Sequence, residues 1–128
     1  MQLQRFDHLV LTTQNLDACL HFYVEILGMR HLESNGRHAL YFGQQKVNIH
    51  TRKGEFQPAA AVPTYGGLDL CLITDTELAQ VKDELVQKGW PILEGIVERS
   101  GALGKMDSLY LRDPDGNLIE LAHYRAEA

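Results

Sequence analysis

Hydrophobic and polar residues alternate over short stretches in the first half of the chain, a pattern typical of β-strands. Residues 6–13 alternate between two faces and predict a strand that carries His8. Apolar residues then recur at helical spacing over 16–27, between a capping Asn15 and a terminating Gly28. Further strands are predicted at 30–32, 38–43 and 46–50, the last two as a hairpin.

The second half of the chain repeats this order of elements. Residues 67–74 predict a strand, and Asp75 or Thr76 is expected to cap a helix that runs to Lys88 before Gly89 ends it. A strand is predicted to begin within 90–95, and a hairpin over 107–124 turns at Asp113-Pro114-Asp115-Gly116.

The first half of the chain aligns with the second half at an offset of 61 residues, and no gap is needed over the first strand and helix of each half. Leu9 then meets Leu70, and Gly28 meets Gly89, so that both helix ends coincide. We infer two βαβββ modules, at about 1–57 and 64–128. The segment at about 53–67, which contains Gly and Pro, reads as the linker between them.

Length and charge narrow the classes of function. A chain of 128 residues suits one compact domain with its own core. The net charge of −5 disfavours nucleic acid and anionic membranes as partners. Because no stretch has the character of a signal peptide or a membrane helix, we expect a cytoplasmic protein with Cys19 and Cys71 as free thiols.

The repeat brings polar residues of metal-ligating types into equivalent strand positions. His8 corresponds to Asp69, and both lie in the first strand of a module. The last strand of the second module carries Glu120 among apolar residues, and that of the first carries Asn48 and His50 on one face. Imidazole and carboxylate groups suit divalent Mn, Fe, Ni, Co or Zn. The pattern therefore predicts a metal site, with Asn48 and His50 as alternatives for one position.

The stretches "FDHLVLTTQNLDACLHFYVEILGM" and "SLYLRDPDGNLIEL" resemble the vicinal oxygen chelate superfamily. That superfamily includes glyoxalase I, fosfomycin- and bleomycin-resistance proteins, methylmalonyl-CoA epimerase and extradiol dioxygenases. The stretches "FGQQKVNIH" and "LDLCLIT" are most similar to its glyoxalase-domain subgroup. The resemblance implies an α+β fold, in which two βαβββ modules form a curved, incompletely closed eight-stranded sheet with helices outside.

The resemblance also implies roles for individual residues. His8 matches the first-strand histidine ligand, and Glu120 matches the last-strand glutamate, which can double as a catalytic base. Asp69 stands where many metal-dependent members have histidine, which lowers the charge of the site by one. Asn48 or His50 takes the fourth position. A metal bound there would chelate two neighbouring oxygens of a small substrate.

Three functions are consistent with the resemblance. The favoured one is a metal-dependent lyase or isomerase similar to lactoylglutathione lyase. The alternatives are an Fe(II)-dependent dioxygenase, disfavoured by Asp69, and a metal-free small-molecule binding protein of the bleomycin-resistance kind. We expect Tyr110, Arg99 and Lys105 to contact substrate, and residues 98–108 to form either a lid or an ordinary surface loop. Family members of this length imply a homodimer.

Overall fold

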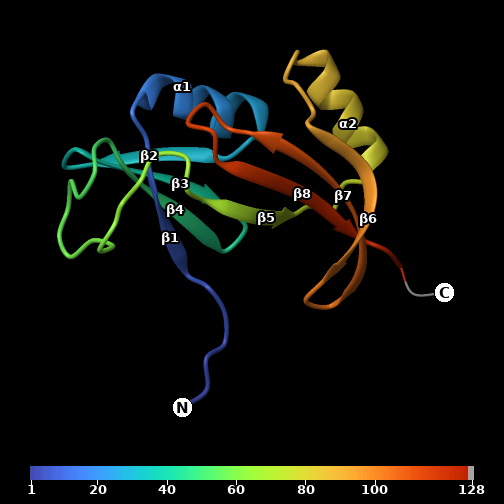
Figure 1. The fold of residues 1–128 in the computed structure, drawn as a ribbon, viewed down its shortest axis with the longest axis horizontal. Coiled ribbons are helices and arrows are strands. Elements are labelled where there is room, and N and C mark those ends of the chain that lie inside the picture. The colour runs from blue at the N-terminus through green and yellow to red at the C-terminus, as the bar shows by residue number, and fades with distance from the viewer. Residues whose placement is uncertain (127–128) are drawn as a thin grey trace. The chain divides into compact units, whose positions relative to one another are not determined.

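The computed structural model describes residues 1–126 of the chain. The chain divides into two compact units, Met1–Gly67 (unit 1) and the part that begins at Leu68 (unit 2). Each unit contains its own four-stranded sheet and its own helical segment (Figure 1). No helix within the described residues has both the length and the apolar character that crossing a membrane requires.

Unit 1 begins with a strand and a helical segment, and a run of three strands completes it. Its elements are β1 (His8–Thr12), α1 (Leu16–Leu20), η1 (His21–Ile26), β2 (Arg30–Ser34), β3 (Arg37–Phe42) and β4 (Gln45–His50). The strand order is β1-β4-β3-β2, with β1 parallel to β4 and the other pairs antiparallel. The helical segment is continuous from α1 into η1, where it takes the wider π form.

Unit 2 repeats this topology. Its elements are β5 (Asp69–Ile73), α2 (Leu78–Gln87), β6 (Glu94–Gly101), β7 (Gly104–Arg112) and β8 (Leu118–Tyr124). The strand order β5-β8-β7-β6 places the first strand parallel to the last, as in unit 1. The α+β prediction of two βαβββ modules is therefore confirmed.

The two helical segments begin in different ways. The Asn15 side chain accepts a hydrogen bond from the amide of Ala18 at 3.0 Å, as the sequence predicts for an N-cap. The helix α2 instead has Glu77 at its N-cap, with no side-chain capping bond. The prediction of Asp75 or Thr76 was wrong, because the hydroxyl of Thr74 accepts from the Thr76 amide at 3.1 Å in a turn before the helix.

The turn between β7 and β8 is held by a buried network. Oδ1 of Asp113 accepts hydrogen bonds from the amides of Asp115 and Asn117, both at 2.9 Å. The Asn117 side chain donates to Oδ2 of Asp113 at 2.8 Å and accepts from the Leu68 amide, also at 2.8 Å. The turn therefore fixes the start of β8 and the residue that precedes β5.

Buried apolar side chains occupy one face of each sheet. The ladders place Leu11, Leu40, Val47 and Ile49 together in unit 1, and Leu109, Leu111, Ile119 and Leu121 together in unit 2. The helical segments add Phe22, Tyr23 and Ile26 in unit 1, and Leu78, Val81 and Leu85 in unit 2. The opposite face of each sheet carries most of the polar residues that the sequence singled out, among them His8, Asn48, Asp69 and Glu120.

Residues 98–108 form neither a lid nor an irregular loop. They belong to the hairpin of β6 and β7, which are paired up to Gly101 and Gly104. The Leu103 amide at the tip donates to the Tyr124 hydroxyl at 3.1 Å. A Cβ atom at Gly101 would lie 2.5 Å from the same hydroxyl, so a glycine is needed for this close approach.

Candidate functional site

The first strand of unit 1 places His8 beside Asn48. Val10 pairs with Asn48 across the parallel ladder, so His8 is a diagonal neighbour of Asn48 on the same face. His50 pairs with Thr12, at the far end of β1 from His8. Four strand residues span about 13 Å, which separates the two imidazoles along the sheet.

Unit 2 presents the same arrangement with different residues. Cys71 pairs with Glu120, so Asp69 is a diagonal neighbour of Glu120 on one face. The pair of Asp69 and Glu120 in unit 2 thus corresponds to the pair of His8 and Asn48 in unit 1.

The ladder decides between the two alternatives for the fourth position. Asn48 is the counterpart of Glu120, and His50 is the counterpart of Ala122. The three side chains with ligand chemistry at equivalent positions are divided between the units, one in unit 1 and two in unit 2. Within residues 1–126, no group of three His, Cys, Asp or Glu side chains has the arrangement of a metal site.

A carboxylate orients the imidazole of His8. Nδ1 of His8 lies 2.8 Å from Oδ2 of Asp7, and this hydrogen bond lowers the pKa of Asp7 below its usual value. Since an ionised carboxylate only accepts, the proton of the neutral ring belongs on Nδ1 and the lone pair on Nε2. Metal-binding histidines commonly donate their second ring N–H to a carboxylate in this way.

Glu120 keeps a buried oxygen without a partner. Its Oε2 is one of the few buried side-chain oxygens in the described residues that lack a hydrogen bond. Burial and the charge of Glu120 together raise the pKa of the neighbouring Cys71 to about 11. Leaving such an oxygen unsatisfied costs about 1–3 kcal/mol, so a proton donor or a cation at this point would stabilise the site.

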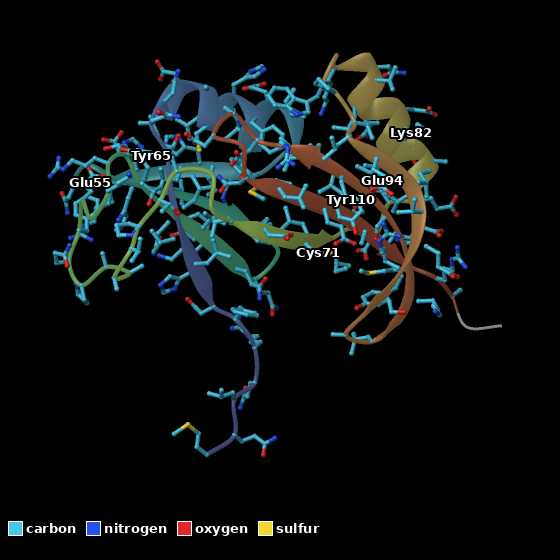
Figure 2. The ribbon with its side chains drawn as sticks, viewed as in Figure 1. Glu55, Tyr65, Cys71, Lys82, Glu94 and Tyr110 are labelled. Carbon is cyan, nitrogen blue, oxygen red and sulfur yellow. The ribbon has the colours of Figure 1, made fainter. Side chains whose placement is uncertain are left out.

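Tyr110 and Arg99 lie on the same face as Glu120. Tyr110, which is labelled in Figure 2, pairs with Glu120 across β7 and β8. The Tyr110 hydroxyl accepts a hydrogen bond from Nε of Arg99 at 2.9 Å. A guanidinium nitrogen of Arg99 also lies 3.5 Å from Oε1 of Glu94. Because Arg99 occupies one acceptor site of the hydroxyl, the Tyr110 proton is available to another acceptor.

Lys105 does not join this group. It lies five residues before Tyr110 on β7, and this odd separation places the two side chains on opposite faces. Its Nζ donates to the Ser100 hydroxyl at 3.3 Å. Of the three predicted substrate contacts, the structure brings together Tyr110 and Arg99.

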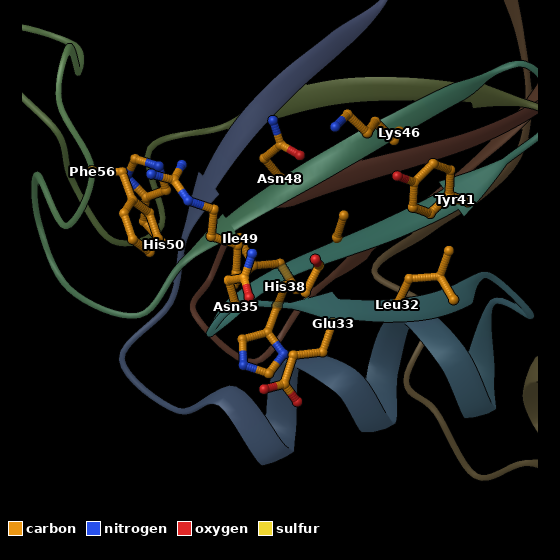
Figure 3. Close-up of a pocket in the computed structure, with 13 residues that line it drawn as sticks. Leu32, Glu33, Asn35, His38, Tyr41, Lys46, Asn48, Ile49, His50 and Phe56 are labelled. Atoms are coloured by element: carbon orange, nitrogen blue, oxygen red, sulfur yellow. The ribbon is translucent and has the colours of Figure 1, made fainter.

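The sequence reasoning missed a pocket of about 470 Å³ in unit 1 (Figure 3). It lies over β2, β3 and β4 and is closed on one side by the segment that follows β4. Its walls include Leu32, Arg37, Ala39, Tyr41, Lys46, Asn48, His50 and Phe56. One sequence pattern could have indicated the floor of this pocket: alternate residues of β3 and β4 place basic, aromatic and amide side chains on one face.

Comparison with known proteins identifies the family. The family model of the Glyoxalase/Bleomycin resistance protein/Dioxygenase superfamily matches residues 5–121. The virulence protein STM3117 of Salmonella typhimurium is 48% identical over 125 residues, which cover 97% of this chain and 87% of that protein. The glyoxalase domain-containing protein RDO1 of Mycosarcoma maydis is 42% identical over 126 residues, 98% of this chain and 71% of that protein.

A solved structure agrees with these sequence matches. The crystal structure of the Salmonella protein superposes with a TM-score of 0.93 at 47% identity, and the match covers 98% of this chain and 100% of the other. The chain therefore belongs to the Glyoxalase/Bleomycin resistance protein/Dioxygenase superfamily, as its sequence resemblance implied.

Proposed function

We propose that this protein is a metal-dependent, glyoxalase-like lyase or isomerase that acts on a small substrate through two neighbouring oxygens. The observation that carries the proposal is the unpartnered, buried oxygen of Glu120 opposite a tyrosine with an available proton. A carboxylate base beside a hydrogen-bond donor is the arrangement that proton transfer next to a carbonyl needs.

In this proposal the ligands of the metal ion are those that the sequence predicts: Asp69 and Glu120, which the structure places as neighbours in unit 2, and His8 of a unit 1. Their chemistry suits Ni, Mn, Fe, Co or Zn. Asp7 orients the imidazole of His8, and Glu120 has an oxygen that nothing in the described chain satisfies. A bound divalent ion would act as a Lewis acid toward negative charge on the substrate oxygens. Asn48, as an amide, would remain a neutral neighbour.

Glu120, Tyr110 and Arg99 have separate roles in the proposed proton transfer. Glu120 accepts a proton from the carbon next to the substrate carbonyl and returns it to the neighbouring carbon, so that the isomerisation leaves the carboxylate unchanged. Tyr110 donates its hydroxyl proton in a hydrogen bond to the oxygen that becomes negative, while Arg99 fixes the ring and its hydroxyl from the side. We further propose that the active form is a homodimer, which light scattering of the purified protein would test.

Metal content is the decisive measurement for this proposal. Protein purified without chelators or a metal-binding tag is expected to carry a divalent ion, and His8→Ala and Glu120→Gln are expected to lose it. The exposed His21 and Glu84 provide matched controls, since His21→Ala and Glu84→Gln remove the same groups from the helical segments. Their metal content should equal that of the parent protein.

A parent protein that is metal-free, and stays empty after incubation with each of the five ions, would overturn the proposal. A sequestering protein that binds its ligand without metal would then be the better description. If metal is bound, isomerisation of an α-ketoaldehyde adduct and oxygen consumption with a catechol would distinguish the lyase from a dioxygenase.

A further inference from the structure

We infer that the pocket of unit 1 binds a small organic acid, with its carboxylate at the guanidinium of Arg37 and its apolar part against Leu32, Ala39 and Phe56. The inference goes beyond the proposed function, because it concerns unit 1 alone and requires no metal. A volume of about 470 Å³ is within the usual range for sites that enclose a small molecule.

The two cations of the pocket have no carboxylate partner. Among the described residues, neither Arg37 nor Lys46 forms an ion pair. This is notable in a chain of net charge −5, because acidic residues are plentiful. Lys46 contributes to lowering the pKa of Asp7, but that carboxylate is paired with His8 instead.

The acidic residues around the pocket are directed elsewhere. Glu33 is the only acidic residue in the wall, and Figure 3 shows its carboxylate pointing away from Tyr41, Lys46 and Asn48. Glu55, in the segment that closes the pocket, accepts hydrogen bonds from the amide and hydroxyl of Thr51 at 2.7 and 2.9 Å. Among the described residues, the Arg37 guanidinium therefore has no carboxylate partner in the pocket.

Aromatic rings hold the cations in place. The Arg37 guanidinium carbon lies 4.0 Å from the centre of the Phe56 ring, and Lys46 Nζ lies 5.9 Å from that of Tyr41. A guanidinium that stacks on a ring by its face keeps its N–H edge available for a carboxylate. His50 packs against Phe56 at 5.3 Å in an edge-to-face arrangement, which fixes the ring.

The side chains of the pocket wall also determine the chemical character of the rest of the acid. Leu32, Ala39 and Phe56 form an apolar surface, and Asn48 adds an amide that can donate or accept. One unpaired guanidinium beside an apolar wall favours a monocarboxylate with a flat or short hydrocarbon part. The chemical class is therefore a small, singly charged organic acid.

Benzoate and benzamide form a matched pair of probes, because they have the same shape and differ in charge. The protein is first stripped of metal with a chelating resin, and each probe is titrated while the backbone amides are followed by NMR. Benzoate is expected to shift amides of β3 and β4, and benzamide at equal concentration to shift them little. Raising the salt concentration is expected to weaken the binding of benzoate.

Substitutions locate the site. Arg37→Gln should weaken benzoate binding at least fivefold, and Arg37→Lys, which keeps the charge but loses the planar fork, should weaken it less. Arg52→Gln is the control, because Arg52 is an exposed cation of unit 1 outside the pocket wall. The amide spectra of the variants check that they remain folded.

The inference would be overturned if benzamide bound as tightly as benzoate, if the shifted amides lay outside β3 and β4, or if Arg52→Gln had the same effect as Arg37→Gln. Tighter binding of inorganic phosphate than of benzoate would also contradict it. Because the protein is metal-free in this experiment, the result is independent of the metal analysis that tests the proposed function.

Discussion

Unit 1 and unit 2 share a topology but present different chemistry on corresponding faces. In unit 1 the polar face carries Lys46, Asn48 and the basic residues of the pocket. In unit 2 the equivalent face carries Asp69 and Glu120. The two units therefore share the strand order and the buried apolar positions that build the sheet. Residues at equivalent positions on the polar face differ between them.

The first test of this comparison concerns the hairpin turns. Asp113→Ala removes the acceptor of two backbone amides and of the buried Asn117 side chain, and should destabilise the protein by about 2–4 kcal/mol. Among the described residues, no such network holds the corresponding turn of unit 1, so Gln44→Ala should change the free energy of unfolding by less than about 0.5 kcal/mol. Urea unfolding measures both, and similar effects would show that the turns are equivalent.

The second test concerns the helix starts. Asn15→Ala removes the capping bond to Ala18 and should cost about 1 kcal/mol. Glu77→Ser introduces a capping side chain where α2 has none, and should stabilise the protein by about 0.5–1 kcal/mol. The midpoint of thermal unfolding should therefore fall for Asn15→Ala and rise for Glu77→Ser. A loss of stability with Glu77→Ser would show that the start of α2 cannot accept a cap.

The smallest effect concerns the environment of Cys71. Burial is the main cause of its raised pKa of about 11, and the charge of Glu120 is the lesser one. Glu120→Gln should therefore lower this pKa only in part, leaving it above the ordinary value. Alkylation by iodoacetamide, followed from pH 8 to 11, reports the pKa, because only the thiolate reacts. Cys19, which is 1% exposed, should stay unmodified in both proteins. An unchanged pKa would mean that Glu120 is protonated or turned away.

The sequence predicted the two modules because their markers are local. Glycines at positive φ end both helical segments, Gly28 at +81° and Gly89 at +72°, and strand alternation is visible in a few residues. The predicted N-cap of α2 was wrong because three residues with a hydroxyl or carboxylate group, Thr74, Asp75 and Thr76, precede the helix. Only the folded turn decides which of these side chains accepts a hydrogen bond from a backbone amide.

The candidate site could be predicted only in part. His8, Asp69 and Glu120 follow from the repeat, but choosing between Asn48 and His50 needs the register of β1 and β4. That register depends on hairpin length, which differs between the modules. The pocket escaped prediction because the alternating residues of β3 and β4 indicate only its floor, whereas the position of Phe56 against His50 depends on how the segment after β4 folds back.

The hydrogen bond between the Leu68 amide and the Asn117 side chain spans 49 residues of sequence. On the ribosome, β5 therefore emerges long before the strand and the turn that hold it have been made. Until β8 leaves the exit tunnel, β5 has no neighbour, and its exposed edge must be shielded from other nascent chains. In unit 2 the pairing of β5 is thus a late step of cotranslational folding, which follows the synthesis of β8.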